Sequence, residues 1–298
     1  MDVARISLLR GVCQTPAYVA KDRGLFAAAG VDAQIDIAPT AWVVPQRMAA
    51  GTLDFAVLPW TRIAAATSAG EDMIAICGSG CEEVALVVRP GIELGEVRTV
   101  AVPHEGGMKD LTAAGLMKSL GLGPEAAVRL PSGDAAIIAF VGSAADAAVM
   151  VEPYATMLEM RGMGRVVRRT GDVWPGAPGC SLATSRRLLR ERPEFVRSVV
   201  RAFVGGAHHL EDHLDDAAQI AGRYIGVSGE IVRRSFDSNR PNVRALHNVA
   251  AMDHVLDLMT DLGYLATKPT GFTDLRFVDE MLSVAPARPR AGAPSKAR

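Results

Sequence analysis

The sequence predicts an α/β fold with two lobes, mostly parallel sheets and a two-stranded hinge. The first observation is an alternation of strand-like and helix-like runs over residues 4–59, which is repeated over residues 97–153. Parallel strands need crossover connections, so this alternation is typical of a parallel sheet covered by helices. The second observation is a pair of single strand-like runs, at 82–91 and 179–189, that can carry the chain out of the first lobe and back.

The first repeat unit begins with a strand that is followed at once by a helix with clear start and stop signals. Thr15 can cap this helix, Pro16 occupies a first-turn position that tolerates proline, and Gly30 can end it. The next run alternates apolar and polar residues, as a strand does. The elements predicted here are a strand at 4–11, a helix at 15–30, a strand at 31–38, a short helix at 40–51 and a strand at 53–59.

The second repeat unit has the same order, and the chain after it is mostly helical. Its predicted elements are a strand at 97–103, a helix at 106–121, a strand at 126–131, a helix at 134–142 and a strand at 145–153. Two later runs, at 192–214 and 248–265, place apolar residues on one face at helical spacing. We expect the first lobe to comprise residues 1–88 and 182–284, the second lobe residues 89–181, and the Pro-, Ala- and basic-rich residues 285–298 a disordered tail.

The composition favours small-molecule partners. Of 298 residues, 49% are hydrophobic and 22% charged, and the formal net charge is −1. This balance gives no general attraction to nucleic acid, and no apolar run approaches the roughly 20 residues that cross a bilayer. We therefore expect no nucleic-acid partner and no membrane insertion. The start MDVARISLLRG lacks the basic and apolar regions of a secretory signal, so we expect a cytoplasmic chain if this start is native and a periplasmic one if a signal was removed.

The cysteines and histidines give no strong metal or disulfide pattern. The chain has four cysteines, Cys13, Cys77, Cys81 and Cys180. They are too few and too scattered for a disulfide scaffold, although a bridge between Cys77 and Cys81 is left open. His209 and His213 have the spacing of two zinc ligands on a helix, but they lie on its polar side and no third ligand follows at a typical spacing. We expect no metal and no cofactor.

The predicted site lies at the carboxyl ends of the parallel strands. In open α/β sheets ligands bind beyond these ends, where helix N-termini present unpaired N–H groups. Six segments follow such ends, and two sets of them that face one another across a cleft make one pocket. These segments are GVCQT, TAW, PWTR, HEGGM, SGD and EPY. The candidate ligand-binding residues in and beside them are Cys13, Gln14, Trp42, Trp60, Thr61, Glu105, Gly106, Gly107, Met108, Glu152 and Tyr154.

Several candidates have a structural alternative. Gly106 and Gly107 either let a helix start approach a carboxylate, sulfonate or phosphate, or form a plain turn. Trp42 and Trp60 either stack on a planar ligand or pack under neighbouring loops. Gln14 either donates an amide hydrogen bond to the ligand or caps the next helix.

The groups that could act as acids or bases have alternatives as well. Glu152 can accept hydrogen bonds from a ligand, cap the next helix or pair with a hinge residue. Cys13 is the cysteine best placed for chemistry, but a free cysteine is more often a small buried hydrophobe. His104 can act as a base or be a hydrogen-bonded structural histidine. Carboxylates at Glu105 and Glu152 argue against a purely polyanionic ligand.

An ordered series of short motifs carries a resemblance to a known family. It comprises PAYVAKDRGLFAAAGVDAQID, AAGTLDFAVLP, VALVVRPG, VRTVAVP, ADAAVMVEPY, SLATSRRLLRERPEFVRSVVRAF and LGYL, and it covers roughly residues 3–265. In this order the motifs resemble ABC-transporter solute-binding proteins for sulfonates, nitrate and related compounds, a family that is also similar to thiamine-pyrimidine synthases. The resemblance implies a type II periplasmic-binding-protein fold that closes on a small ligand by hinge motion, with a membrane permease as partner. The cysteine-rich motif of the synthases is absent, because CGSGC at 77–81 has only two cysteines.

Two functions of different classes remain open. The first is a solute-binding protein, as an importer receptor or a sensor, that closes on a small organic acid or heterocycle, with planar and aromatic compounds included. The second is a cytoplasmic enzyme on the same scaffold that acts on a similar molecule, with His104, Glu105 or Glu152 as acid or base. Binding is favoured, because no catalytic set can be assembled from the sequence spacing.

Overall fold

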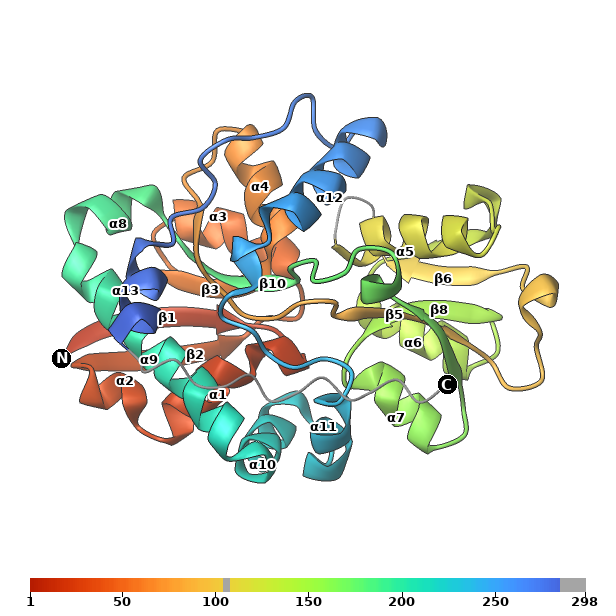
Figure 1. Ribbon diagram of the computed structural model, residues 1–298, viewed down its shortest axis with the longest axis horizontal. Coiled ribbons are helices and arrows are strands. Elements are labelled where there is room, and N and C mark those ends of the chain that lie inside the picture. Colours follow the sequence, from red (N-terminus) through yellow and green to blue (C-terminus); the bar gives the residue numbers. More distant parts are fainter. Residues whose placement is uncertain (104–107, 285–298) are drawn as a thin grey trace.

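The computed structural model of the protein describes residues 1–103 and 108–284 and has two lobes, each built on a five-stranded sheet (Figure 1). The first sheet consists, in spatial order, of β2 (Val31–Ile37), β1 (Asp2–Leu8), β3 (Phe55–Pro59), β10 (Cys180–Thr184) and β4 (Ile74–Gly78). The second consists of β7 (Ala127–Leu130), β6 (Val100–Pro103), β8 (Ala147–Val151), β5 (Val84–Val88) and β9 (Arg165–Arg169). The α/β architecture with two lobes is thus confirmed.

Each sheet has four strands in one direction and one strand reversed. In the first sheet β1 is parallel to β2 and β3, whereas β10 is antiparallel to β3 and β4. In the second sheet β6 is parallel to β7 and β8, whereas β5 is antiparallel to β8 and β9. The prediction of mostly parallel sheets is therefore correct. The reversed strand is in each case the one that the chain forms directly after it crosses between the lobes.

The two crossing segments pair with each other and form the hinge. The N–H of Gly179 donates to the carbonyl of Gly80 at 2.8 Å, and the N–H of Glu82 donates to that of Ala177 at 2.9 Å. The strand pairing differs by a few residues from the expected lobe boundaries at 88 and 181. Residues 84–88 already belong to the second sheet, and β10 enters the first sheet at Cys180, because each crossing leads straight into a strand of the lobe that it enters.

The helices cover both faces of each sheet. Those of the second lobe are α5 (Met108–Ser119), α6 (Gly133–Val141) and α7 (Tyr154–Met160). Those of the first lobe are α1 (Thr15–Asp22), α2 (Leu25–Ala28), α3 (Val44–Ala49), α4 (Trp60–Ser68), α8 (Arg186–Glu191), α9 (Pro193–Asp212), α10 (Leu214–Ile225), α11 (Gly229–Ser235), α12 (Val249–Asp261) and α13 (Arg276–Val284). The helix predicted at 15–30 is split, because Gly24 adopts a left-handed conformation with φ of 68° between α1 and α2.

The core of the first lobe lies on both faces of its sheet. Helices α1, α9 and α10 pack on one face, and α4 and α12 pack on the other. Gly206 of α9 lies so close to α1 that a Cβ there would be 2.1 Å from the Pro16 carbonyl oxygen. Glycine at this position therefore allows the two helices to come into close contact.

The lobes touch on both flanks of the hinge. On one flank Leu111 of α5 packs into the same core cluster as Trp60, and the Tyr264 hydroxyl donates to the Asp110 carboxylate at 2.6 Å. On the other flank, where α11 lies beside α7 (Figure 1), the Ser238 hydroxyl donates to Glu152 Oε1 at 3.1 Å. These contacts hold the lobes together around the space between them.

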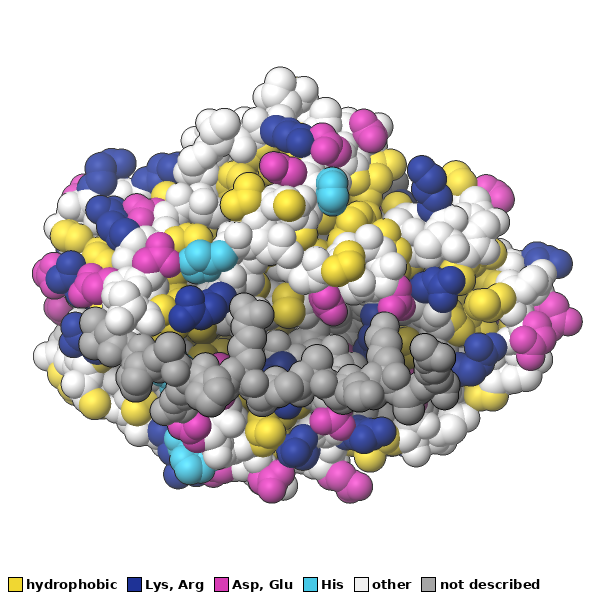
Figure 2. Space-filling view, in the orientation of Figure 1, with side chains coloured by type: hydrophobic (Ala, Val, Ile, Leu, Met, Phe, Trp, Pro, Cys, Tyr) yellow, Lys and Arg dark blue, Asp and Glu magenta, His cyan; other side chains and the backbone are white. Residues whose placement is uncertain are grey.

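The surface carries both signs of charge. Figure 2 shows Lys and Arg side chains interspersed with Asp and Glu over the described part of one face, as the near-zero net charge leads one to expect. Among the described helices, none combines the length and the apolar composition that crossing a bilayer requires.

Candidate ligand-binding site

A cavity of about 270 Å³ lies between the lobes, where the carboxyl ends of the parallel strands meet. Residues from the ends of six strands line it, three from each lobe. They are residues 9–11 after β1, 38–40 after β2, Pro59 of β3, Pro103 of β6, 131–133 after β7 and 151–152 at the end of β8. The cavity thus lies where the strand-end argument predicts a ligand site.

Five of the predicted binding residues line this cavity. They are Cys13, Gln14, Trp42, Glu152 and Tyr154. That they bind a ligand stays a prediction. His104, Glu105, Gly106 and Gly107 lie outside the described residues, and Met108 begins α5 but its side chain is outside them as well.

Trp60 and Thr61 do not line the cavity, which corrects their placement. Trp60 is 0% exposed, stacks on Phe272 with ring centroids 5.9 Å apart, and donates its Nε1–H to the carbonyl of Pro178 at 2.8 Å. Thr61 is buried too, and its hydroxyl has no hydrogen-bond partner among the described residues. Because α4 begins directly at the end of β3, its first two side chains point into the core, and Arg62 is the residue of this turn that lines the cavity.

Trp42 and Arg62 form one wall of the cavity. The guanidinium of Arg62 lies 4.3 Å from the Trp42 ring centroid, in a cation–π contact. Burial lowers the pKa of Arg62 from its usual value, and its buried Nε has no hydrogen-bond acceptor among the described residues. Trp42 is 37% exposed. An aromatic face and a guanidinium with unused hydrogen-bonding capacity therefore lie side by side in the cavity wall.

Lys109 brings a second cation into the cavity from the other lobe. It lies in the first turn of α5, and its Nζ is so close to the start of α6 that a Cβ on Gly133 would be 2.2 Å from it. Burial lowers the pKa of Lys109, while Asp134, Cys180, Cys13 and Glu83 act in the opposite direction. With Arg10 and Arg62, three basic side chains line the cavity.

Glu152, a candidate for ligand binding or catalysis, has its carboxylate occupied by the protein. Its Oε1 accepts from Arg169 Nη1 at 2.6 Å and from the Ser238 hydroxyl at 3.1 Å, and its Oε2 accepts from the Thr156 N–H at 3.0 Å. The side chain is 1% exposed. The helix-capping alternative therefore describes this residue, since its carboxylate accepts from the first turn of α7. Its other two partners, Arg169 and Ser238, lie outside the crossing segments of the hinge.

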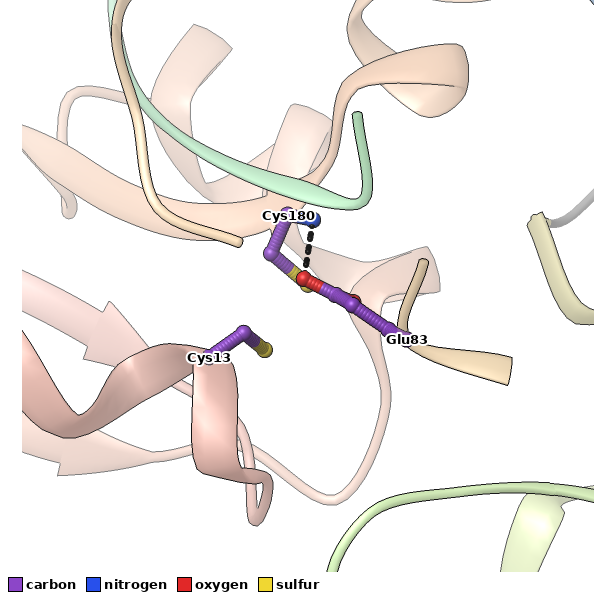
Figure 3. A group of neighbouring side chains, drawn as sticks. All are labelled: Cys13, Glu83 and Cys180. Carbon is purple, nitrogen blue, oxygen red and sulfur yellow. Dashed lines mark hydrogen bonds between the residues drawn. The ribbon is translucent and has the colours of Figure 1, made fainter. Parts of the chain in front are cut away.

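Cys13, Glu83 and Cys180 form a buried cluster at the back of the cavity (Figure 3). The pKa of Cys13 is raised, because burial and the Glu83 carboxyl outweigh the lowering hydrogen bond with Cys180. That bond and burial raise the pKa of Cys180 well above its usual value. Both thiols are thus protonated at neutral pH and are weak nucleophiles. All four cysteines are free, so the bridge between Cys77 and Cys81 is not formed.

The chain matches the sequence model of one protein family. The sequence model of the NMT1-like family matches residues 3–225, about three quarters of the chain. The chain belongs to the NMT1-like family. No curated protein sequence matches this NMT1-like chain.

Solved structures show the same fold at low sequence identity. The ligand-binding component of an ABC-type import system from Staphylococcus aureus, with zinc bound, has a TM-score of 0.83 and 15% identity, covering 94% of this chain and 99% of that one. The alkanesulfonate-binding protein SsuA from Xanthomonas axonopodis pv. citri, bound to MOPS, has a TM-score of 0.78 and 15% identity over 92% and 99%. The periplasmic nitrate-binding protein NrtA from Synechocystis PCC 6803 has a TM-score of 0.80 and 12% identity over 95% and 89%. The type II periplasmic-binding-protein fold of this NMT1-like chain is thereby confirmed.

Sequence reasoning missed several charged residues that line the cavity of this NMT1-like protein. They are Arg10, Arg62, Glu83, Lys109 and Asp134. Four of them lie in or next to the strand-end segments. The rule that ligands bind beyond strand ends therefore found their segments, but it did not show which side chains point into the cavity. Glu83 precedes β5 at the opposite end of a strand, and nothing in the sequence pattern marks it.

Proposed function

We propose that this chain is a solute-binding protein of an ABC import system, or a sensor of the same type, whose lobes close on a small organic anion. The observation that carries the proposal is the inter-lobe cavity, with basic side chains from both lobes and one aromatic wall. Its volume of about 270 Å³ lies just below the usual range of about 300–1,000 Å³ for ligand sites, which fits a small ligand.

The charge balance of the cavity favours an anion. Three basic residues face three acidic ones, Glu83, Asp134 and Glu152. Glu152 is neutralised by Arg169, and burial raises the pKa of Glu83, which favours its neutral form. With Glu83 and Glu152 neutralised, the three basic residues outnumber Asp134, and the net charge of the cavity lining is positive. The two neighbours whose names give a sulfonate and nitrate as ligands bind anions, in keeping with this proposal.

The described residues favour binding over catalysis. A general base must have an oxygen or nitrogen free to reach the substrate, and both carboxylate oxygens of Glu152 already accept protein hydrogen bonds. Cys13 is held as a thiol. Of the three acid or base candidates that the sequence offered for the enzyme alternative, His104 and Glu105 lie outside the described residues.

A thermal-shift screen tests the proposal. The purified chain is heated with sulfonates, nitrate, aromatic carboxylates, pyrimidines and polyamines, and each hit is examined by mass spectrometry after incubation. We expect an anion to raise Tm by mass action and to be recovered unchanged. Recovery of an altered compound would establish an enzyme, and stabilisation by polyamines alone would contradict the anion preference.

Trp42→Ala is expected to weaken binding of aromatic anions about tenfold, because it removes a stacking surface and the ring that supports Arg62. Titration calorimetry with an aromatic sulfonate measures the change. Val43→Ala is the matched control, since Val43 is equally exposed and does not line the cavity. Equal affinities of the two variants would show that the Trp42 ring does not contact the ligand.

Binding of a sulfonate is expected to weaken as pH rises. The anion binds the protonated form of Lys109, and burial places the pKa of Lys109 below its ordinary value of 10.5. Above that lowered pKa, Lys109 must take up a proton each time an anion binds, so affinity falls by about tenfold per pH unit. Ionisation of the nearby groups Glu83, Cys13 and Cys180 acts in the same direction.

Lys109→Met separates these contributions to the pH profile. The variant is expected to bind weakly and to lose the part of the fall that comes from the lysine. An unchanged pH profile in the variant would exclude Lys109 as the titrating group. A sulfonate is used because its own charge stays constant over this range.

A further inference from the structure

Three potential metal-binding side chains converge at the hinge. Cys13 lies in the short turn after β1, Glu83 lies in the outgoing crossing, and Cys180 begins β10 (Figure 3). Their donor atoms all lie within 4.8 Å of one another, and the residues are only 7%, 7% and 4% exposed. A tetrahedral Zn²⁺ holds thiolate and carboxylate ligand atoms about 3.5–3.8 Å apart, so the side chains need to draw in by at most about an ångström.

The local backbone makes room for the carboxylate. A Cβ on Gly80 would lie 2.4 Å from Glu83 Oε1, and one on Gly179 would lie 2.1 Å from Glu83 Cδ. Gly80 also lies against Cys13, whose Cβ would be 2.8 Å from the added atom. Any larger residue at either position would displace the donor groups. The two hinge glycines thus form a cradle in which the Glu83 side chain meets the thiols.

Hydrogen bonds orient the donors. The Cys180 N–H donates to Glu83 Oε1 at 2.6 Å. Gln14 Nε2 donates to Cys13 Sγ at 3.2 Å, and Gln14 Oε1 in turn accepts from the Leu9 N–H at 3.2 Å. Outer contacts of this kind fix the ligands of metal sites and tune their basicity. Gln14 is 0% exposed, so its amide has no role at the surface that would explain this arrangement.

The chemistry of the donors selects a thiophilic cation. Two thiolates and a carboxylate suit zinc and similar ions far better than Mg²⁺ or Ca²⁺, which prefer oxygen alone. Together they carry three negative charges, of which a divalent ion neutralises two. The ammonium of Lys109 interacts electrostatically with all three groups and balances the third.

We propose that Cys13, Glu83 and Cys180 bind a thiophilic divalent cation such as Zn²⁺, with a fourth position open to the inter-lobe cavity. All three residues line that cavity, and a site with three protein ligands leaves one position for water or for a donor atom of the solute. Binding releases the two thiol protons to solvent, together with the carboxyl proton of Glu83 in chains where burial keeps that group neutral. The site goes beyond the proposed anion binding and does not depend on it, and it is contrary to the expectation from sequence that the chain has no metal site.

The test uses the full chain, reduced with a phosphine under nitrogen and with no organic ligand added. Zn²⁺ is titrated in a calorimeter, and Co²⁺ is used in parallel because thiolate coordination gives it a charge-transfer absorption. We expect one ion per chain and a Co²⁺–thiolate band that Zn²⁺ removes. Absence of binding under these conditions overturns the proposal.

Variants then assign the ligands. Cys180→Ser and Cys13→Ser are expected to lower Zn²⁺ affinity more than about a hundredfold, which exceeds the ~10–100-fold effects of outer-shell changes, and Gln14→Met is expected to lower it about tenfold. Cys81→Ser is the matched control, because Cys81 lies in the same hinge but outside the cluster, and it should bind as the original chain does. Unchanged affinity in Cys180→Ser overturns the assignment.

X-ray absorption at the zinc edge of the unaltered chain gives an answer that needs no variant to fold. Two sulfur and two oxygen or nitrogen neighbours support the site. Oxygen and nitrogen neighbours alone contradict it and would place the ion elsewhere on the chain.

Discussion

Replacing Trp60 by alanine is expected to lower the free energy of unfolding by about 3–5 kcal/mol. The indole is fully buried in the core between the sheet of the first lobe, α4 and α12, and it stacks on Phe272. The substitution leaves a cavity in the core. It also removes the N–H that donates to the Pro178 carbonyl, and the loss of a buried hydrogen bond adds to the cost. Urea unfolding followed by circular dichroism measures the change.

Two comparisons make this expectation specific. Trp60→Phe keeps most of the ring and loses the N–H, so its cost should be intermediate. Trp42→Ala should cost less than about 1 kcal/mol, because its side chain is more than one third exposed. If Trp60→Ala unfolded like the original chain but bound anions poorly, Trp60 would belong to the cavity wall and its placement in the core would be wrong.

Arg169→Met is expected to lower the free energy of unfolding by about 3 kcal/mol, the lower end of the range for breaking a buried ion pair. It leaves the Glu152 carboxylate, which is 1% exposed, without its cation. The cost stays at the lower end because the Thr156 N–H and the Ser238 hydroxyl still donate to that carboxylate. Urea unfolding again gives the value.

A matched control and a second substitution isolate the ion pair. Arg168 lies next to Arg169 in the same strand, and its Nη1 donates to the carbonyl of the neighbouring Val167. Arg168→Met should therefore cost well under 1 kcal/mol. Adding Glu152→Gln to Arg169→Met should recover part of the loss, since the unpaired charge is removed. Equal losses in Arg168→Met and Arg169→Met would mean that the ion pair contributes nothing.

The fold could be predicted from the sequence because its signals are local. Alternating strand and helix runs lie within short windows, and they specify two parallel-type sheets. The expected cap at Thr15 was wrong, because Thr15 is the first residue of α1 and its hydroxyl donates to the Val12 carbonyl. Local signals could not predict to which lobe residues 84–88 belong. That run pairs with β8 and β9, which depends on the direction in which the chain leaves the crossing.

The site could be predicted only to the level of segments. The strand-end rule found the segments that bring Trp42 and Tyr154 to the cavity, but the direction of a side chain in the first turn of a helix depends on the helix phase. This phase buries Trp60 and turns Arg62 to the cavity. The cluster of Cys13, Glu83 and Cys180 is assembled by strand pairing and hinge bonds between segments far apart in the sequence, so spacing could not reveal it.

Calorimetric titration of Lys109→Met, with the anion that stabilises the original chain most, is the most direct test of the central claim. Lys118→Met is its control, because Lys118 is exposed in the last turn of the same helix. The account predicts one anion per chain, a loss of about 30-fold or more for Lys109→Met, equivalent to about 2 kcal/mol or more for a buried charge contact, and no change for Lys118→Met. Equal affinity of Lys109→Met and the original chain would contradict anion binding between the lobes.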